Sequence, residues 1–205
     1  MLTLYDFLPS GNGYKVRLTL ALLGRPYRLI EKNILKGETR TPEFLKINAN
    51  GRIPTLVLDD GTALAESNAI IFFLARDTAL WPAEKLDQAK ALQWMFFEQY
   101  SHEPYVAVLR AYRHVGFTVT PEVEARMPEL ERRSYQALGV MEEHLVKAPF
   151  FAGSKLSIAD IALFAYTHVA EQGGLELSRF PAIQSWIERV EATPHFVPIT
   201  YRPKD

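Results

Sequence analysis

The stretch from Asn48 to Ile70 limits the possible folds of this chain more than any other. It contains a short apolar run at Thr55–Leu58 and a turn at Asp59-Asp60-Gly61, after which the chain can return as the second strand of a hairpin. Pro54 lies directly before the apolar run, and since proline has no N–H to donate, it belongs at the beginning or the edge of a strand. Glu66-Ser67-Asn68 precede a second apolar run, which predicts that a helix begins there.

The same stretch has two features of a ligand site. A cis peptide bond before Pro54 would turn the backbone of Ile53 outward as a free pairing edge. Glu66 and Ser67 would place backbone N–H groups and a hydroxyl at a helix N-terminus, where a carboxylate binds well. Together these features suit a small peptide with a free end, although a hairpin followed by a capped helix would explain them without any ligand.

The residues before this stretch alternate between strand and helix patterns. Residues that favour β structure predict strands over Leu2–Tyr5 and Tyr27–Asn33, and the apolar spacing predicts a helix over Tyr14–Leu23. A short helix is expected over Thr41–Ile47, with the threonine as its N-cap and Pro42 as its first helical residue. With the hairpin and the helix after it, the order is β-α-β-α-β-β-α, which is that of a thioredoxin-like α/β domain.

The pattern changes near Asp77, and no convincing strand follows it. Long helical regions are expected over residues 84–115 and 122–147, and Pro104 predicts a kink or break inside the first of them. A final helix is expected over residues 180–192. The sequence therefore predicts that an all-helical domain follows the α/β domain.

Ser157 and Asp160 mark the start of a further helix in this second part. Their spacing predicts a capping box, in which the serine hydroxyl and the carboxylate each accept a hydrogen bond from the other residue's backbone N–H. The predicted division of the chain is an α/β domain over residues 1–77, a linker over residues 78–85 and an all-helical domain over residues 86–196.

These motifs carry a resemblance to a known family. Arg52-Ile53-Pro54 followed by Glu66-Ser67, and the Ser-x-x-Asp element at Ser157, resemble the cytosolic glutathione S-transferases over nearly the whole chain, to about residue 196. The resemblance implies that the backbone of Ile53 pairs with the cysteinyl part of glutathione, and that Glu66 and Ser67 hold its γ-glutamyl end. It also implies a homodimer that uses glutathione as a co-substrate.

Two arginines extend the implied glutathione site. Arg52 lies where a basic residue can reach a carboxylate of glutathione, and Arg40 lies where relatives often carry Gln or His near the glycyl end. A guanidinium pairs well with a carboxylate. A solvated surface arginine is the simpler explanation, above all for Arg40.

The loop Pro9–Gly13, which precedes the first helix, is the predicted thiolate site. Its glycines let a ligand approach the backbone, and the start of a helix lowers the pKa of a thiol. The loop resembles that of the bacterial and fungal (theta- and nu-like) classes, which implies that Ser10 or Asn12 stabilises the thiolate. Tyr5 is a third candidate, because some classes keep a catalytic tyrosine at the end of the first strand, but the loop after it argues against this. Loop and N-cap chemistry would explain Ser10 and Asn12 without catalysis.

The second substrate is expected to bind between the two domains. Tyr105, Leu109 and Tyr112 follow one another at i, i+4 and i+7 and so share one helix face, with Arg113 beside it. A mixture of aromatic residues and arginine suits a small apolar electrophile. A stripe of this kind is nevertheless more often part of a helical core.

Composition excludes several other classes of protein. The chain has no cysteine, so it cannot form a disulfide, a Cys-rich zinc site or a CxxC redox pair, and any thiol must come from the ligand. A net charge of −1 without a long run of one sign argues against nucleic acid and anionic membranes as partners. No apolar run approaches the roughly 20 residues of a membrane helix, and with no signal peptide a cytoplasmic location is expected. The five histidines have no metal-binding spacing, so no metal is expected.

The resemblance implies that the protein conjugates glutathione, as its thiolate, to electrophiles. A related possibility is glutathione-dependent reduction of disulfides or peroxides, which uses two glutathione molecules and no protein cysteine. A third is a binding or scaffold protein that keeps the fold without turnover, as regulatory members of the family do. The presence of both Ser10 and Asn12 favours catalysis, because a scaffold needs no thiolate donor.

Overall fold

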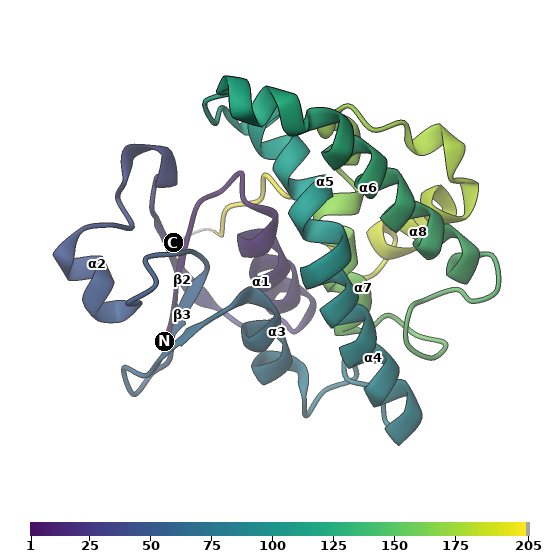
Figure 1. The fold of residues 1–205 in the computed structure, drawn as a ribbon. Helices are drawn as coiled ribbons and strands as arrows, with labels where there is room; N and C mark the ends of the chain where they lie inside the picture. The colour runs from purple at the N-terminus through teal and green to yellow at the C-terminus, as the bar shows by residue number, and fades with distance from the viewer. Residues whose placement is uncertain (204–205) are drawn as a thin grey trace. The chain divides into compact units, whose positions relative to one another are not determined.

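The structure, a computed structural model, describes residues 1–203 and forms two compact units (Figure 1). The first unit contains residues 1–78 together with residues 194–203, and the second contains Ala79–Thr193. This division differs from the predicted one at its C-terminal end, because residues 194–196 pack with the α/β unit rather than with the helical one. The chain therefore leaves the first unit after residue 78 and later returns to it.

The first unit is built on a mixed four-stranded sheet with the strand order β2-β1-β3-β4. β1 (Leu2–Asp6) pairs in parallel with β2 (Tyr27–Glu31) and antiparallel with β3 (Thr55–Val57). β3 forms the predicted hairpin with β4 (Ala63–Ala65). β1 is thus the central strand, and the segments that leave its C-terminal end and enter β3 lie beside each other.

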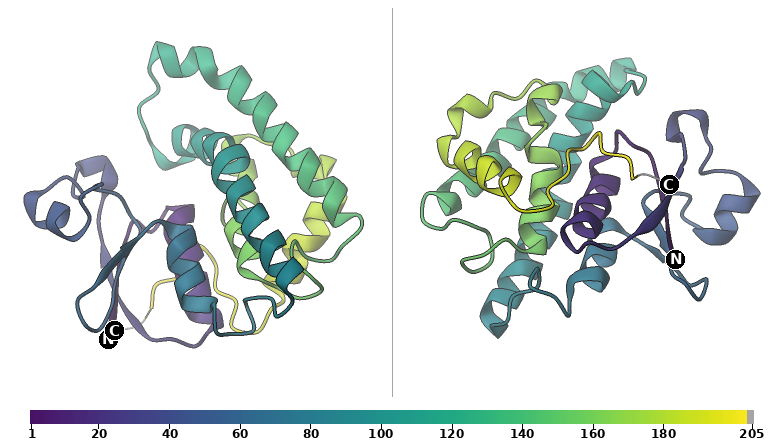
Figure 2. Two further views of the ribbon diagram at one scale, coloured as in Figure 1. Left: turned by 60° about the horizontal axis from the view of Figure 1, so that its bottom comes forward. Right: turned by 180° about the vertical axis from the view of Figure 1, so that it is seen from behind.

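Three helices flank this sheet. α1 (Gly11–Leu22) and α3 (Ser67–Ala75) pack against each other on one side, and α2 (Pro42–Ile47) lies on the other side (Figure 2). Thr41 caps α2 as predicted, with its hydroxyl oxygen accepting the Phe44 N–H at 3.3 Å. The order β-α-β-α-β-β-α confirms the predicted thioredoxin-like fold.

α1 begins at Gly11 rather than at Tyr14, the predicted start. Ser10 is its N-cap, and its side-chain oxygen accepts the Gly13 N–H at 3.2 Å, which satisfies one of the orphan donors of the first turn. This cap compensates for the poor helix propensity of the two glycines. Asn12 therefore lies in the first turn of the helix and not in the loop before it.

The second unit is all helical, as predicted. α4 (Lys85–Phe97) and α5 (Glu103–Arg110) are joined by a π-helical turn at Glu98–His102, and a second π-helical turn follows at Ala111–Val115. Pro104 lies in the first turn of α5, where a missing N–H breaks no helical hydrogen bond. The predicted break at this proline thus takes the form of the π-helical turn before it.

Three further helices complete this unit, and short 3-10 turns connect elements in both units. The helices are α6 (Pro121–Leu145), α7 (Ile158–Thr167) and α8 (Pro181–Glu191), and the 3-10 turns are Ile34–Lys36, Ala170–Gly173 and Leu177–Arg179. No helix within residues 1–203 is both long enough and apolar enough to cross a membrane.

The capping box at Ser157 is confirmed and anchors the core of the helical unit. The Ser157 N–H donates to Oδ2 of Asp160 at 2.9 Å, and the whole of α7 is buried. Oδ1 of Asp160 also accepts from the backbone N–H of Phe151 and from the indole N–H of Trp186, each at 3.0 Å. One buried carboxylate therefore ties the start of α7 to the preceding turn and to α8.

Candidate functional site

The segment that enters β3 contains a cis peptide bond and is fixed by a buried amide. The peptide bond between Ile53 and Pro54 is cis, Pro54 is buried, and Arg52 is exposed. Asn48, which follows α2 as its C-cap, donates from Nδ2 to the carbonyl of Arg52 at 2.9 Å and to Oγ1 of Thr55 at 3.0 Å. This buried amide fixes the turn into the strand. The sequence analysis did not single it out, although its place directly after a predicted helix was a signal.

The residue between β4 and α3 has an unusual backbone conformation. Glu66 has φ 67° and ψ 111°, a region that non-glycine residues rarely occupy and that costs on the order of 1–3 kcal/mol. Its side chain is exposed and makes no capping hydrogen bond to α3. Such strain is concentrated at ligand sites, and here it presents a carboxylate at the start of a helix.

A hydrogen bond joins the two predicted halves of the site. The hydroxyl of Ser67, at the start of α3, donates to Oδ1 of Asn12, in the first turn of α1, at 3.0 Å. Ser67 is the residue expected to hold the γ-glutamyl end of glutathione, and Asn12 is expected to face its thiol. Since Oδ1 of Asn12 accepts from Ser67, the orientation of the Asn12 amide depends on Ser67.

Lys15 is a residue of this site that the sequence analysis missed. Its side chain is 0% exposed, and Nζ lies 3.5 Å from Oγ of Ser67. A buried cation next to the contact between Ser67 and Asn12 favours negative charge in its surroundings. The available signal was its spacing of three residues from Asn12, which puts both on one side of α1.

Ser10 and Tyr5 differ in how they face this region. The hydroxyl of Ser10 accepts one backbone N–H, so its own O–H can still donate to a thiolate. Tyr5 instead packs its ring edge-on against Phe44 of α2, with ring centroids 5.7 Å apart. Because side chains alternate along a strand and the next residue, Asp6, contacts α1, Tyr5 points to the opposite side of the sheet. The preference for Ser10 and Asn12 over Tyr5 stays a prediction.

The two predicted arginines are both exposed. Arg40 donates from Nη1 to the carbonyl of Asn50 at 3.0 Å, which holds its guanidinium against the backbone just before Gly51. Arg52 directly precedes the cis Ile53–Pro54 bond. Each can present a cation to a carboxylate from solvent.

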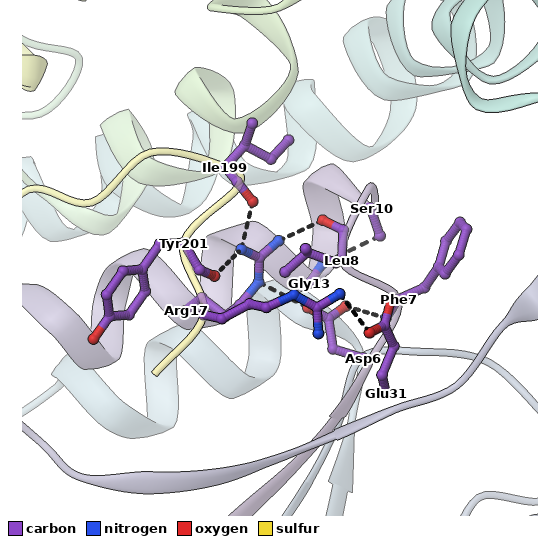
Figure 3. Close-up of polar contacts among 10 residues, drawn as sticks. Asp6, Phe7, Leu8, Ser10, Gly13, Arg17, Glu31, Ile199 and Tyr201 are labelled. Atoms are coloured by element: carbon purple, nitrogen blue, oxygen red, sulfur yellow. Dashed lines mark hydrogen bonds and ion pairs between the residues drawn. The ribbon is translucent and has the colours of Figure 1, made fainter. Parts of the chain in front are cut away.

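A fully buried ion pair lies beneath the loop that carries Ser10 (Figure 3). Nε of Arg17, on α1, donates to Oδ2 of Asp6, at the end of β1, at 2.8 Å, and both side chains are 0% exposed. The other carboxylate oxygen accepts the Phe7 N–H at 2.7 Å. Burial raises the pKa of Asp6 to about 6, although Arg17 acts in the opposite direction. A side chain at Gly13 would collide with this carboxylate, so only glycine fits there.

The four residues predicted to contact the electrophile lie in the helical unit in different settings. Leu109 is 0% exposed and packs against Gly173, so the structure places it in the core and not at a binding surface. Arg113 donates from Nη1 to the carbonyl of Gly173 at 2.7 Å, and the ring of Tyr112 packs edge-on against Phe117. Their shared helix face is therefore partly a core face, as is common for such stripes.

Tyr105 alone among these four lines a cavity within the helical unit. The cavity has a volume of about 230 Å³ and is formed by α4, the π-helical turn after it, α5 and α6. The cavity is lined by Phe97, Tyr100, Ser101, Tyr105, Arg133, Gln136, Ala137 and Val140.

Within residues 1–203, no group of three or more histidine, aspartate or glutamate side chains is arranged to hold a metal ion.

Comparisons with known proteins agree with this fold and this geometry. The family model described as glutathione S-transferase, N-terminal domain, matches residues 1–76, and the one for the C-terminal domain matches residues 87–194. The chain belongs to the glutathione S-transferase family. Among curated relatives, the disulfide-bond oxidoreductase YfcG of Escherichia coli (strain K12) is 32% identical, and the match covers 95% of this chain and 92% of that protein.

Two solved structures illustrate the similarity. A glutathione S-transferase from Pseudomonas fluorescens is 48% identical, with a TM-score of 0.90, and the match covers 97% of this chain and 98% of that one. Ure2p in complex with glutathione is 25% identical, with a TM-score of 0.84, and the match covers 95% of each chain. The similarity thus extends over both units and includes a glutathione-bound relative.

Proposed function

We propose that this protein binds glutathione as a thiolate and joins the glutathione sulfur to an electrophile. The observation that carries the proposal is the hydrogen bond between Ser67 and Asn12, because it joins the two predicted halves of a glutathione site in one unit. In the proposed complex, the backbone of Ile53 pairs with the cysteinyl part, and Glu66 and Ser67 hold the γ-glutamyl end. Arg40 and Arg52 are proposed to pair with the carboxylate at the glycyl end.

The chemistry requires a thiolate near neutral pH. The pKa of a free thiol is near 8.5, and lowering it by about two units takes roughly 2.7 kcal/mol of preferential binding to the anion. The hydroxyl of Ser10, the amide of Asn12, the start of α1 and the charge of Lys15 are the proposed sources. The thiolate then attacks the electrophilic atom, a new bond to sulfur forms, and the leaving group departs with its electron pair.

The electrophile is proposed to contact Tyr105, Tyr112 and Arg113. Aromatic rings and a guanidinium suit an apolar molecule that carries electron-withdrawing groups. Leu109 is not included, because its burial gives it a core role.

Reduction of disulfides by glutathione is a second candidate, favoured by the similarity to the E. coli disulfide-bond oxidoreductase. One glutathione thiolate attacks the disulfide, forms a mixed disulfide and releases one thiol. A second glutathione thiolate then attacks the mixed disulfide, which releases the other thiol and gives oxidised glutathione. This route needs no protein cysteine, and the chain has none.

The deciding experiment is an ultraviolet titration of bound glutathione against pH, in wild type and in the Ser10→Ala and Asn12→Ala variants. We expect the pKa of the bound thiol to lie at least one unit below that of free glutathione in wild type. The variant that loses this shift identifies the principal donor. Ser178→Ala, an exposed serine in the helical unit, is the matched control and should keep the shift.

Two turnover assays then separate the candidates. Glutathione and chlorodinitrobenzene test conjugation, and glutathione with hydroxyethyl disulfide tests reduction. If glutathione binds with an unshifted thiol pKa and neither assay shows turnover, the protein is a binding or scaffold member of the family. If glutathione does not bind, the proposed site residues are wrong.

We also propose that the protein is a homodimer, with the helical unit contributing to the interface. Leu92, Phe96 and Tyr100 follow at i, i+4 and i+8 along α4 and the turn after it, and they are 38%, 70% and 83% exposed. We call these three residues the apolar ridge. Tyr100 also lines the cavity described above, so an apolar surface and a hollow adjoin each other, as a self-complementary contact requires.

A further inference from the structure

The C-terminal tail, residues 194–203, packs onto α1 of the first unit. The hydroxyl of Tyr14 donates to the carbonyl of Val197 at 2.7 Å. The guanidinium of Arg17 donates from Nη1 to the carbonyls of Ile199 at 2.6 Å and Tyr201 at 3.2 Å (Figure 3). The tail is thus held by backbone carbonyls that point at two buried side chains of one helix.

Arg17 connects this tail to the loop that carries Ser10. From Nη2 it donates to the carbonyl of Leu8 at 2.7 Å, and from Nε it donates to Asp6 (Figure 3). The guanidinium is planar and its donors have a fixed geometry, so the positions of these acceptors depend on one another. A shift of the tail carbonyls therefore changes where the Leu8 carbonyl is held.

Two of the four acceptors of Arg17 come from the tail. The side chain is 0% exposed, so water does not replace an acceptor that is lost while the residue stays buried. A buried donor without an acceptor is costly, and more so when it carries a charge. Without the tail, Arg17 would move toward solvent and release the Leu8 carbonyl.

The loop between Leu8 and Ser10 is also held by backbone hydrogen bonds. The Ser10 N–H donates to the Phe7 carbonyl at 2.7 Å, and the Phe7 N–H donates to Asp6. The second of these bonds ends on the same ion pair as the Leu8 contact. Ser10 is consequently held from two sides, by its N-cap bond to the Gly13 N–H and by the segment that Asp6 and Arg17 hold. A displacement of about 1 Å at a catalytic group costs about a hundredfold in rate.

We propose that Arg17 and the tail carbonyls of residues 197–201 are positioning elements of the thiolate site. This inference rests on the proposed function, since it assumes that glutathione binds as a thiolate beside Ser10 and Asn12. The tail fixes Arg17, Arg17 fixes the Leu8–Ser10 segment, and that segment directs the Ser10 hydroxyl. Neither Arg17 nor the tail needs to touch the ligand.

The test measures the thiol pKa of bound glutathione in the full-length chain with Arg17→Lys and Tyr14→Phe. A lysine keeps the charge beside Asp6 but cannot span the acceptors in the tail and the loop. We expect Arg17→Lys to raise the thiol pKa by about one unit, a tenfold change in the thiolate equilibrium, and to slow turnover about tenfold. Tyr14→Phe removes one tail contact and should raise the thiol pKa by a smaller amount, which corresponds to a change of about threefold in the thiolate equilibrium.

Hydrogen exchange and a surface control make the result specific. The Tyr201 N–H donates to the Pro198 carbonyl at 2.9 Å. In both variants this N–H should exchange its hydrogen faster than in wild type. Arg76→Gln removes an exposed ion pair with Asp77 in the same unit and should change neither the tail nor the thiol pKa.

The outcomes distinguish this inference from the proposed function. If the wild-type protein itself does not lower the thiol pKa, the proposed function fails first. If wild type lowers it, and a folded Arg17→Lys variant keeps the same value, the inference is wrong. If Arg17→Lys does not fold, Tyr14→Phe decides: faster exchange in the tail with an unchanged thiol pKa overturns the inference, and faster exchange with a raised pKa supports it.

Discussion

Ser67 of α3 and Asn12 of α1 are 55 residues apart in the sequence, and the hydroxyl of one donates to the amide oxygen of the other at 3.0 Å. The bond fixes which end of the Asn12 amide is directed away from α3. We predict that Ser67→Ala weakens glutathione binding about tenfold or more and also raises the thiol pKa, because it removes a ligand contact and the orientation of Asn12 together. Calorimetric titration with glutathione and the ultraviolet titration measure the two effects. An effect on affinity alone would mean that Asn12 does not depend on Ser67.

Lys15 should act through its charge. Lys15→Met keeps the length of the buried side chain and removes the cation near Ser67. We expect the thiol pKa of bound glutathione to rise by about half a unit or more, since nearby positive charge favours an anion. Lys46→Met, at an exposed position on α2, is the control. Equal behaviour of the two variants would assign Lys15 a packing role only.

The two helix caps should differ in their contribution to stability. Ser157→Ala breaks a buried capping box that also positions Asp160, and we expect a loss of about 2 kcal/mol in the free energy of unfolding. Thr120→Ala removes an exposed cap of α6, in which the hydroxyl accepts the Val123 N–H at 3.4 Å, and should cost about 0.5 kcal/mol. Urea denaturation of both variants measures the difference. Equal losses would contradict the role given to Asp160.

Asp6 and His168, one in each unit, should respond to acid in opposite directions. Burial raises the pKa of Asp6 to about 6, so the folded first unit binds this proton more tightly than the unfolded chain does. The contribution of Asp6 to stability is therefore largest at low pH and falls as pH rises from about 4 to about 6, by at most about 3 kcal/mol. Asp6→Asn should remove this dependence, as measured by unfolding between these pH values.

His168, in the helical unit, has the reverse sign. Burial lowers its pKa to about 4, so the folded state disfavours the proton that the unfolded chain takes up near pH 6.5. Its contribution is present above pH 6.5 and is lost as pH falls toward 4. His168→Gln should reduce the acid sensitivity of the helical unit, and parallel pH curves for wild type and variant would show that another group is responsible.

The proposed dimer gives a prediction about the apolar ridge. Phe96→Glu places a charge in the middle of the ridge and should convert a dimer into a monomer, as measured by light scattering coupled to gel filtration. Val146→Glu is a matched control, because Val146 lies outside the ridge and is also 70% exposed. A wild-type protein that is monomeric at micromolar concentration would contradict the proposed dimer.

The features that could be predicted from the sequence are those set by neighbouring residues. The hairpin after Pro54, the N-cap at Thr41 and the capping box at Ser157 depend on residues within a few positions of one another, and the structure confirms each. α1 begins before its predicted start, because glycines at positions 11 and 13 are poor helix formers and Ser10, which caps the helix, also fits a loop.

The features that could not be predicted depend on distant partners. Arg17 and Lys15 lie on a helix whose charged residues would ordinarily face solvent, and their partners are up to 184 residues away in the sequence. The acceptors in the tail are backbone carbonyls, which leave no trace in the choice of side chains. For the same reason the tail after Pro194 could not be assigned to the first unit.

The return of the chain to the first unit has a consequence for synthesis in the cell. A ribosome releases residues 1–78 first, but the carbonyls of Ile199 and Tyr201 that complete the surroundings of Arg17 emerge only after the whole helical unit. Domains ordinarily fold in the order in which they are made. Here the unit that is made first is completed only after the helical unit, so in a nascent chain the surroundings of the proposed thiolate site stay incomplete until residues 194–203 have docked.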